Sequence, residues 1–574
     1  MAMKLIRSNW TEKISCPKYG RMEITLPIKN EENTSIEITG PDGLKETIPS
    51  YLDQPAEFRM DQHGYEALET AGEPCRRFRY TPERPGSYRW QAVDCPEISG
   101  SFFCTESEEP GYVQVSQKDP RYFACTSGAS YVPIGPNACI LRYDALPRGE
   151  EHFATGDQYA TLGISLYRRW FAQMRDAGVN YTRLWLSSVY LNTRTRYPGR
   201  HDLAKFHRLD TVMELAREYG IRVKLCLEHF RCFGPSPDDL TKPSFVKELW
   251  DERTHQPYQP EQGRMEEWLT SPYWNQKWQE DIEPYLARYA NDPIVFAWEL
   301  WNEMDCVAAP YEQALDFTSR MAQWLRSRSP RNMICNSTGS FDWEGKIKAL
   351  RQMASHPALD FGQFHRYVDQ GAKMEICHAD ALELAADGVR QMSVEGRPVI
   401  LNETGAVNDC HTGPFRFYPM DHAGTILNDV TYAPFFAGAA GSGHSWHWEY
   451  YVDPQELWQN YQPLIQLLQG IQVDEEAFET FEMSMESVRL LGLRGRKHTL
   501  LYVRSAADRW DRLFRDQQPA VPVENLHLPF SSQRTQIIGL REDEHLNGCY
   551  ELSADQLQLP AFSHGFVARL EAKA

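Results

Sequence analysis

The sequence lacks the features of several large protein classes. Its 574 residues include 13 cysteines, an odd number, and no CxxC pair, so neither a disulfide framework nor a zinc ribbon is indicated. No apolar run approaches the roughly 18 residues of a membrane-spanning helix, and residues 1–15 show no apolar core or cleavage site of a signal peptide. We therefore expect free thiols, no membrane partner and a cytoplasmic location, or secretion if a leader preceded this chain.

Positive charge and metal-binding motifs are also scarce. The chain carries 60 Lys and Arg against 79 Asp and Glu, which gives a formal net charge of −19. A surface of that sign repels nucleic acid, so we expect no nucleic-acid partner, and a neutral ligand fits better. HExxH and EF-hand spacings are absent. We expect no metal and no other cofactor, and the sequence leaves a homo-oligomer open.

Three regions differ in their patterning. Residues 1–118 and 474–574 show short alternating runs separated by turn clusters, which predicts an N-terminal and a C-terminal β-sandwich. In residues 119–473, short apolar runs alternate with longer amphipathic stretches, such as Thr211–Tyr219. The eight strand candidates there are Tyr131–Asn137, Tyr181–Ser187, Arg222–Glu228, Val295–Asn302, Asn332–Ser337, Asp360–His365, Val399–Glu403 and Ser442–Trp448.

Eight strands alternating with helices predict an α/β fold, a (β/α)8 TIM barrel flanked by the two sandwiches. Examples of the helix-period stretches between the strands are Leu166–Ala177, Thr211–Tyr219, Asn275–Tyr289, Tyr311–Ser327, Ala379–Val394 and Pro454–Leu468. The connection from Glu228 to Asn275 is much longer than the others. A loop of that length in a barrel usually forms a functional rim.

Two carboxylates follow strands that end at the same mouth of such a barrel. The fourth strand candidate runs into Glu303 and the seventh ends at Glu403, and catalytic groups of barrels lie at these strand ends. Glycoside hydrolysis needs such a pair, one protonated to assist the leaving group and one ionised to attack the anomeric carbon. Retention of configuration requires the carboxyl groups to be about 5–5.5 Å apart.

The sequence around both carboxylates resembles clan A glycoside hydrolases, the group that includes family five. WNE at 301–303 and NETGA at 402–406 match the fourth and seventh strand ends of that clan, and the flanking β-regions resemble those of a bacterial subset. The resemblance implies a retaining O-glycosyl hydrolase that cleaves a β-linked oligosaccharide through a glycosyl-enzyme. It also implies that Glu303 is the general acid/base and Glu403 the nucleophile.

The same resemblance implies further site residues. Arg183 matches the second-strand Arg that keeps the nucleophile ionised, and Asn302 the residue that binds the sugar 2-hydroxyl. The other matches are a pocket His on the third strand, a His-x-Tyr pair on the sixth and a Trp on the eighth: His229, His365 and Tyr367, and either Trp446 or Trp448. The two Trp candidates are not separable here, because residues two apart share a face of a strand.

Several alternatives stay open at this point. An endo-acting mannanase or glucanase, an arabinofuranosidase and a galactofuranosidase all fit a clan A barrel. A carbohydrate-binding protein without activity on the same fold is a rival, since fold does not prove activity. The presence of both Glu with Arg183 and Asn302 argues against it. An adhesion protein built on the two sandwiches leaves the barrel unexplained. Glu299 is predicted to be structural and paired to an Arg or a His.

Overall fold

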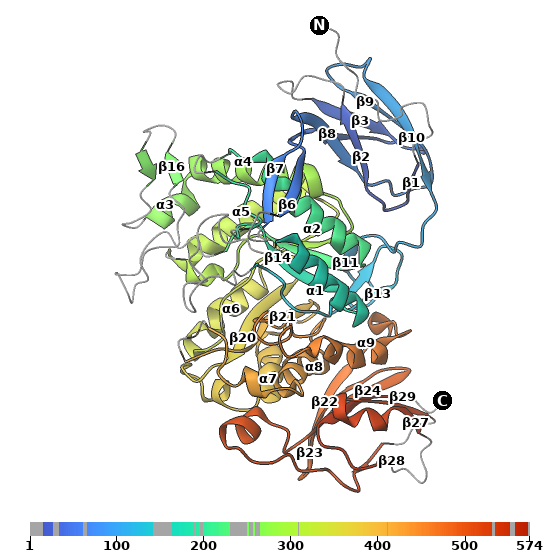
Figure 1. Ribbon diagram of the computed structural model, residues 1–574, viewed down its shortest axis with the longest axis vertical. Helices are drawn as coiled ribbons and strands as arrows, with labels where there is room; N and C mark the ends of the chain where they lie inside the picture. Colours follow the sequence, from blue (N-terminus) through green and yellow to red (C-terminus); the bar gives the residue numbers. More distant parts are fainter. Residues whose placement is uncertain are drawn as a thin grey trace.

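The computed structural model shows three β-rich or α/β regions in series, with the N-terminal strands at one end of the long axis and the C-terminal strands at the other (Figure 1). It describes residues 15–26, 34–60, 66–141, 163–188, 190–195, 199–229, 249–251, 256–258, 264–307, 309–409, 411, 413–530, 534–550 and 557–571. Most of the long connection after Glu228 lies outside this set. No described helix combines the length and the apolar character that crossing a membrane requires.

The N-terminal region holds two sheets that share one core. Alternating strands such as β2 (Met22–Leu26), with Met22, Ile24 and Leu26 buried, place one face inward. The first sheet has the order β1 (Ser15–Pro17), β10 (Ser99–Thr105), β9 (Gly86–Ala92), β3 (Ser35–Thr39) and β4 (Lys45–Pro49). The second sheet has the order β2, β8 (Cys75–Tyr80) and β5 (Tyr51–Asp53). Two smaller sheets lie outside this core: the hairpin of β6 (Ala56–Met60) and β7 (Glu66–Thr70), and the sheet of β11 (Val113–Val115), β12 (Phe123–Cys125) and β13 (Ser130–Tyr131).

The barrel is built from parallel strands that are buried on both faces. Strands in such a position appear as continuous apolar runs rather than as alternating ones. Four of them pair in the order β14 (Tyr181–Trp185), β15 (Arg222–Cys226), β18 (Val295–Glu299) and β19 (Met333–Cys335). The other two, β20 (Gly362–Val368) and β21 (Val399–Ala406), also pair in parallel.

Single hydrogen bonds and bridges close the barrel where regular strands are short. Ser340 bridges His365 of β20, and Thr404 of β21 bridges Ser445. The predicted first and eighth strands are extended segments rather than regular strands, linked by the bond from the Asn137 amide to the Ser445 carbonyl at 3.0 Å. The predicted class, a TIM barrel flanked by β-sheets, is confirmed.

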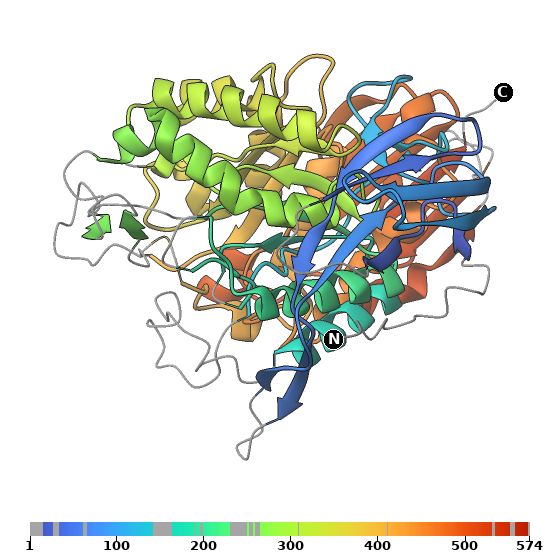
Figure 2. The same cartoon turned by 90° about the horizontal axis from the view of Figure 1, so that it is seen from above.

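The helices cover the outside of the barrel. In Figure 2 the green and yellow-green helices of residues 264–328 lie side by side along one flank. Helix α8 was not predicted because all of its residues are buried, so it has no polar stripe. The helices are α1 (Ile164–Asp176), α2 (Phe206–Glu218), α3 (Arg264–Thr270), α4 (Pro272–Tyr289), α5 (Tyr311–Arg328), α6 (Ile347–Ala354), α7 (Ala381–Met392), α8 (Thr425–Phe436) and α9 (Gln462–Leu468).

The C-terminal region is a six-stranded antiparallel sheet. One of its faces contacts α8 and α9 of the barrel, and the other covers a separate core that includes Leu501 and Phe566. The strand order is β22 (Glu479–Ser484), β23 (Val488–Arg494), β24 (His498–Ser505), β29 (Gly565–Glu571), β26 (Thr535–Gly539) and β27 (Gly548–Tyr550). A short ribbon in the same region pairs β25 (His527–Leu528) with β28 (Leu557–Gln558). A second short ribbon, in the long connection of the barrel, pairs β16 (Leu249–Asp251) with β17 (Gln256–Tyr258).

A buried ion cluster attaches this sheet to the barrel. Arg504 of β24 reaches both oxygens of Asp380 at 2.6 and 2.7 Å and one oxygen of Asp429 at 2.7 Å. Asp380 also caps α7 by accepting from the Leu382 amide at 3.0 Å. Burial raises the pKa of Asp429 to about 8 in spite of Arg504, because Asp380 adds a second negative charge. One guanidinium therefore offsets two carboxyl groups from two helices.

We predict that Arg504→Leu lowers the free energy of unfolding by about 3–5 kcal/mol, because it leaves the buried Asp429 without this cation and Asp380 with only Arg509, at 3.6 Å. Urea unfolding at neutral pH measures the change. Arg59→Leu is the matched control, since Arg59 is 63% exposed and pairs with an exposed Glu69, and exposed pairs contribute roughly 0–1 kcal/mol. Equal effects of the two substitutions would contradict the assignment.

Candidate active site

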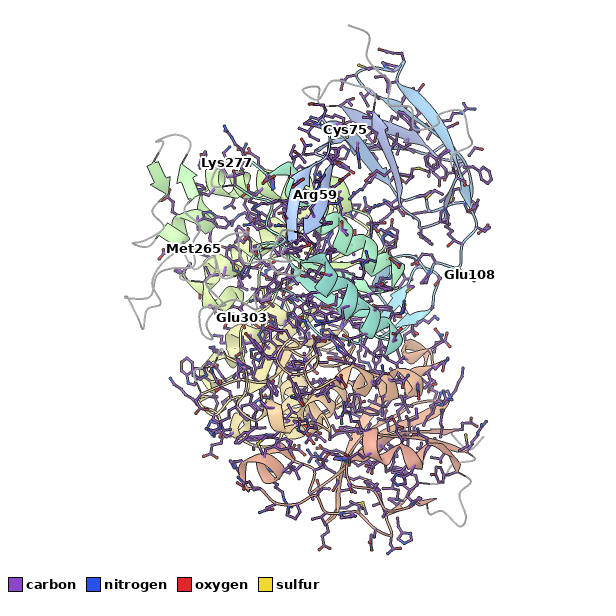
Figure 3. The ribbon with its side chains drawn as sticks, in the orientation of Figure 1. Arg59, Cys75, Glu108, Met265, Lys277 and Glu303 are labelled. Atoms are coloured by element: carbon purple, nitrogen blue, oxygen red, sulfur yellow. The ribbon has the colours of Figure 1, made fainter. Side chains whose placement is uncertain are left out.

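Glu303 and Glu403 lie together at the carboxyl end of the barrel strands. Glu403 is inside β21, and Glu303 follows β18 after three residues. A carboxylate oxygen of Glu303 lies within 4.8 Å of one of Glu403. Figure 3 places Glu303 at the barrel, apart from the labelled Cys75 and Glu108 of the N-terminal region. This spacing belongs to the short class, in which one carboxylate attacks directly, and not to the spacing of about 6.5–9.5 Å that leaves room for a water molecule.

The backbone of Glu303 is left-handed, with φ 57° and ψ 56°. That conformation costs a non-glycine residue roughly 1–2 kcal/mol, and local bonds hold it. The Ser337 hydroxyl accepts from the Glu303 amide at 3.0 Å, and the Ser337 carbonyl accepts from the Met304 amide at 3.0 Å. The turn separates the side chain of Glu303 from the strand residues before it. Strained residues of this kind are concentrated at functional sites.

Arg183 is the central cation of the site. Its guanidinium is fully buried and bonds both oxygens of Glu299 at 2.6 and 2.8 Å, the Asn302 side-chain oxygen at 2.7 Å, and Glu403 Oε1. Burial opposes the charge of Arg183, but the carboxylates raise its pKa well above the usual value. Glu299 pairs with an Arg, as the sequence predicted, and its pKa falls to about 2 because Arg183 and Lys224 together outweigh burial.

Glu403 is surrounded by donors. Besides Arg183, the Tyr367 hydroxyl donates to Glu403 Oε2 at 2.6 Å, and His365 Nδ1 lies 3.4 Å from the same oxygen. Burial and the neighbouring carboxylate raise the pKa of Tyr367 well above its usual value, so this phenol stays a donor. A cation and a phenol that both donate to one carboxylate favour its ionised form. This is the environment that a nucleophile requires.

Glu303 has the opposite environment. Its side chain contacts His365, whose Nδ1 lies 2.8 Å from Glu303 Oε1. Burial raises the pKa of Glu303 to about 8, and the negative charge of Asp305 adds to the shift, whereas Lys346 and Arg183 oppose it. At neutral pH this carboxyl is therefore protonated while Glu403 is paired with a cation. Two carboxyl groups with environments that diverge in this way can serve as acid and nucleophile.

The remaining predicted residues divide between the site and the core. His229 Nδ1 lies 2.6 Å from the Ser187 hydroxyl, and its ring stacks on Trp185 at 4.5 Å. The ring centroids of Trp446 and Trp185 lie 5.0 Å apart, and Trp446 is 8% exposed. Trp448 is fully buried and packs edge-on against Trp170 of α1. Of the two Trp candidates, Trp446 is the one placed beside the site residues.

Three polar residues of the barrel interior were missed. Lys224, Gln363 and Asn402 lie on β15, β20 and β21 and are all fully buried. Lys224 donates to the side-chain oxygens of Gln363, at 2.6 Å, and Asn402. The available signal was the lysine within the otherwise apolar RVKLC segment, because a cation in a strand buried on both faces must have partners.

Two groups in the described part of the chain could hold a cation by the nature of their atoms. The first is Glu303, His365 and Glu403, where His365 Nδ1 already bonds Glu303. The second consists of Asp342, Asp369 and His411. Within it, Asp369 pairs with the His411 ring and Asp342 with Lys346 at 3.0 Å. Both sets are internally paired, and the expectation of a metal-free enzyme stays a prediction.

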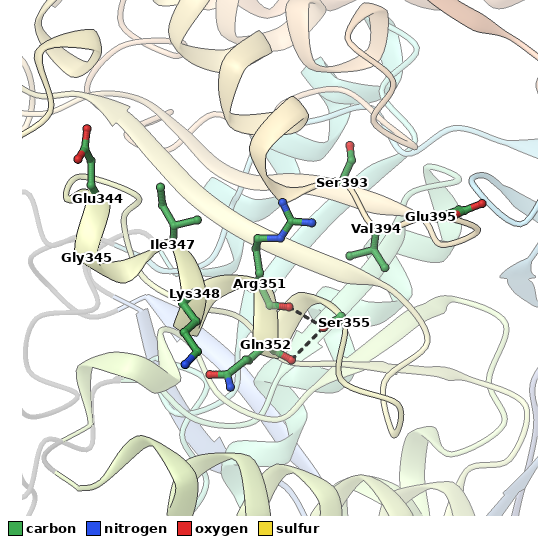
Figure 4. A pocket seen from close by; sticks show the side chains of 10 residues that line it. All are labelled: Glu344, Gly345, Ile347, Lys348, Arg351, Gln352, Ser355, Ser393, Val394 and Glu395. Atoms are coloured by element: carbon green, nitrogen blue, oxygen red, sulfur yellow. Dashed lines mark hydrogen bonds between the residues drawn. The ribbon is translucent and has the colours of Figure 1, made fainter.

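A separate groove of about 670 Å³ lies beside α6, on the outer layer (Figure 4). Lys348, Arg351 and Gln352 of α6 line one side, and Ser393 to Glu395 line the other. The Ser355 hydroxyl is bonded to the backbone of α6, at 2.7 Å from the Arg351 carbonyl. No residue of the carboxylate site lines this groove.

Comparison with known proteins gives one consistent family. Over 343 residues the chain is 27% identical to mannan endo-1,4-beta-mannosidase F of Aspergillus clavatus. The alignment covers 55% of this chain and 67% of the relative. It is 22% identical over 323 residues to a probable mannan endo-1,4-beta-mannosidase A of Aspergillus flavus, covering 50% and 73%.

Solved structures share the fold over nearly the whole chain. A putative glycoside hydrolase from Bacteroides vulgatus aligns with a TM-score of 0.56 at 13% identity, covering 98% of this chain and 100% of that one. A family 5 glycoside hydrolase from the same organism aligns at 0.50 and 12% identity, covering 81% and 94%. Residues 157–417 match the cellulase family, which is glycosyl hydrolase family 5. That segment contains both Glu303 and Glu403, and across it the chain is similar to glycosyl hydrolase family 5.

Proposed function

We propose that this enzyme hydrolyses β-linked mannosides with retention of anomeric configuration, with Glu303 as general acid/base and Glu403 as nucleophile. The observation that carries the proposal is the pair of carboxyl groups, whose oxygens approach within 4.8 Å and whose environments differ. Glu403 bonds Arg183 and Tyr367, whereas burial raises the pKa of Glu303 to about 8. Short spacing with opposite protonation is what double displacement needs.

In the first step, a Glu403 oxygen attacks the anomeric carbon and the bond to the leaving oxygen breaks. Glu303 gives its proton to that oxygen, so the leaving group departs as a neutral alcohol. The product is a glycosyl ester on Glu403 and an ionised Glu303. Arg183 and Tyr367 hold Glu403 from the side of the barrel, which leaves its attack geometry fixed before substrate binds.

In the second step, Glu303 acts as a base. It takes a proton from a water molecule, whose oxygen attacks the anomeric carbon and releases Glu403 as a carboxylate. Glu303 is then protonated again and the cycle closes. The two inversions give overall retention. The close approach of the two carboxyl groups supports this sequence, because Glu303 acts on one face of the anomeric carbon in both steps while Glu403 attacks and leaves on the opposite face.

The β-mannoside assignment is supported by the relatives, whose names state mannan endo-1,4-beta-mannosidase activity. Two residues of this chain fit sugar contacts. Asn302 has a side-chain Nδ2 with no bond to the described residues, while its oxygen is taken by Arg183. That N–H is available to a sugar hydroxyl. Trp446 offers an aromatic face beside Trp185, and such faces pack against the C–H faces of sugar rings.

Substituting the two glutamates separately distinguishes their roles. We predict that Glu303→Ala lowers kcat/KM for manno-oligosaccharides by about 10²–10⁴-fold, but spares the first step of a dinitrophenyl β-mannoside, which leaves without protonation. Azide then restores turnover and yields the β-mannosyl azide. Azide with Glu403→Ala attacks directly and yields the α-azide.

Glu395→Ala is the control, since Glu395 lines the outer groove and should retain wild-type activity. The configuration of each azide product is measured by NMR. Opposite configurations would show that the roles of Glu303 and Glu403 are exchanged. An inactive wild type on every β-mannoside, with activity on another glycoside, would overturn the substrate and leave the residue roles to be tested on that glycoside.

The raised pKa of Glu303 predicts the alkaline limb of the pH profile. An acid with a pKa of about 8 is protonated below that pH and loses its proton as the pH rises through it. We therefore expect kcat/KM of the wild type to fall with increasing pH above about 8. Glu303→Gln has no proton to lose, so its residual kcat/KM on a dinitrophenyl β-mannoside should lack this limb. Persistence of the limb in that variant would assign it to another group.

A further inference from the structure

Beside the carboxylate pair, a chain of fully buried polar groups links four strands, β15, β18, β20 and β21. It runs from Glu299 through Gln363, Lys224 and Asn402 to His365. The two mechanistic steps above use none of its members. Because a buried donor or acceptor is costly without a partner, each link restricts the orientation of the next.

The donor and acceptor character of these groups fixes their orientations. The Glu299 carboxylate only accepts hydrogen bonds, so Gln363 directs its amide nitrogen, Nε2, to Glu299 Oε1 at 2.7 Å. Gln363 Oε1 then faces Lys224 Nζ at 2.6 Å. Lys224 also donates to Asn402 Oδ1. Burial lowers the pKa of Lys224 and the charge of Glu299 opposes that shift, and every near partner of the amine is an oxygen.

The orientation of Asn402 decides the tautomer of His365. With Oδ1 turned to Lys224, Asn402 presents its Nδ2 to His365 Nε2 at 2.9 Å. An amide nitrogen can only donate, so Nε2 is the bare ring nitrogen and Nδ1 carries the proton. The ring is neutral, since burial lowers the pKa of His365 to about 4 against the opposing charge of Glu403. The charged groups around the ring are Glu303, Glu403, Arg183, Glu299 and Lys224.

This tautomer matters because Nδ1 faces the acid. The Nδ1–H donates to Glu303 Oε1 at 2.8 Å. A protonated Glu303 must therefore carry its own proton on Oε2, away from the ring. In the other tautomer, the lone pair of Nδ1 would face Glu303 and accept the acid proton, which would then be held by His365 instead of reaching the leaving oxygen.

We propose that Lys224 and Asn402 are positioning residues that hold His365 as its Nδ1–H tautomer, so that the acid proton of Glu303 resides on Oε2. The inference rests on the proposed role of Glu303 and deepens it. It assigns a purpose to a buried lysine that touches neither carboxylate of the pair in the described contacts, its nearest carboxylate being Glu299 at 3.8 Å.

The first test measures the unsubstituted protein and needs no activity; a substitution serves only to assign the signals. In protein labelled with ¹⁵N at the histidine rings, the His365 signals are identified by their loss in His365→Gln. We expect the one-bond proton coupling on Nδ1 and none on Nε2 at pH 7. A proton on Nε2, or equal population of both tautomers, would overturn the proposal whatever the substrate turns out to be.

The second test reverses the hydrogen bond between residue 402 and His365 Nε2. Asn402→Asp replaces the donating amide by an accepting oxygen of nearly the same shape. His365 must then carry a proton on Nε2, as the other tautomer or as imidazolium, and Glu303 loses its hold on the acid proton either way. We expect kcat/KM on manno-oligosaccharides to fall by about 10²-fold or more, while the first step on a dinitrophenyl β-mannoside falls far less.

Asn336→Asp is the matched control, because Asn336 is also buried in the barrel but its amide donates to Thr318 at 2.9 Å and not to a histidine. It adds the same charge without the tautomer change. Equal losses on both leaving groups in Asn402→Asp, with Nδ1–H still present and Nε2 still bare, would show a merely structural effect and overturn the proposal. If Asn402→Asp does not fold, the wild-type ring measurement still decides.

Discussion

A cation buried inside the barrel sets the terms for the site around it. Removing a guanidinium from water costs several kcal/mol unless other charges and donors compensate, and Arg183 is compensated by Glu299, Asn302 and Glu403 from two other strand regions. Those bonds bring the ends of β14, β18 and β21 into one geometry. They also distinguish the two glutamates, because Glu403 bonds the guanidinium and Glu303 does not.

The charge balance of the interior explains the division of roles. Arg183 and Lys224 provide two buried cations, and Glu299 and Glu403 provide two buried anions. Glu303 has no such cation partner among the described contacts, and burial, with the negative charge of Asp305, raises its pKa to about 8.

Much of this was predictable from the sequence, and the exceptions have physical causes. The parallel strands and the two carboxylates follow from apolar runs that end in Glu303 and Glu403, since strand ends define the mouth of a barrel. Helix α8 escaped notice because burial on all sides removes the amphipathic signal. Lys224, Gln363 and Asn402 were missed because hydrogen-bond partners across a barrel are separated by many residues in the chain. The choice of Trp446 over Trp448 needed the turn at His447, whose φ is 59°.

Trapping the covalent intermediate tests the central claim most directly. A 2-deoxy-2-fluoro-β-mannosyl fluoride slows both steps but keeps a leaving group that needs little protonation, so the glycosyl-enzyme accumulates. Proteolysis and mass spectrometry then locate the modified residue. We expect one fluoromannosyl group per chain, on the peptide that contains Glu403, and none in Glu403→Gln. Modification of Glu303, or of no carboxylate in an enzyme that turns over β-mannosides, would contradict the account.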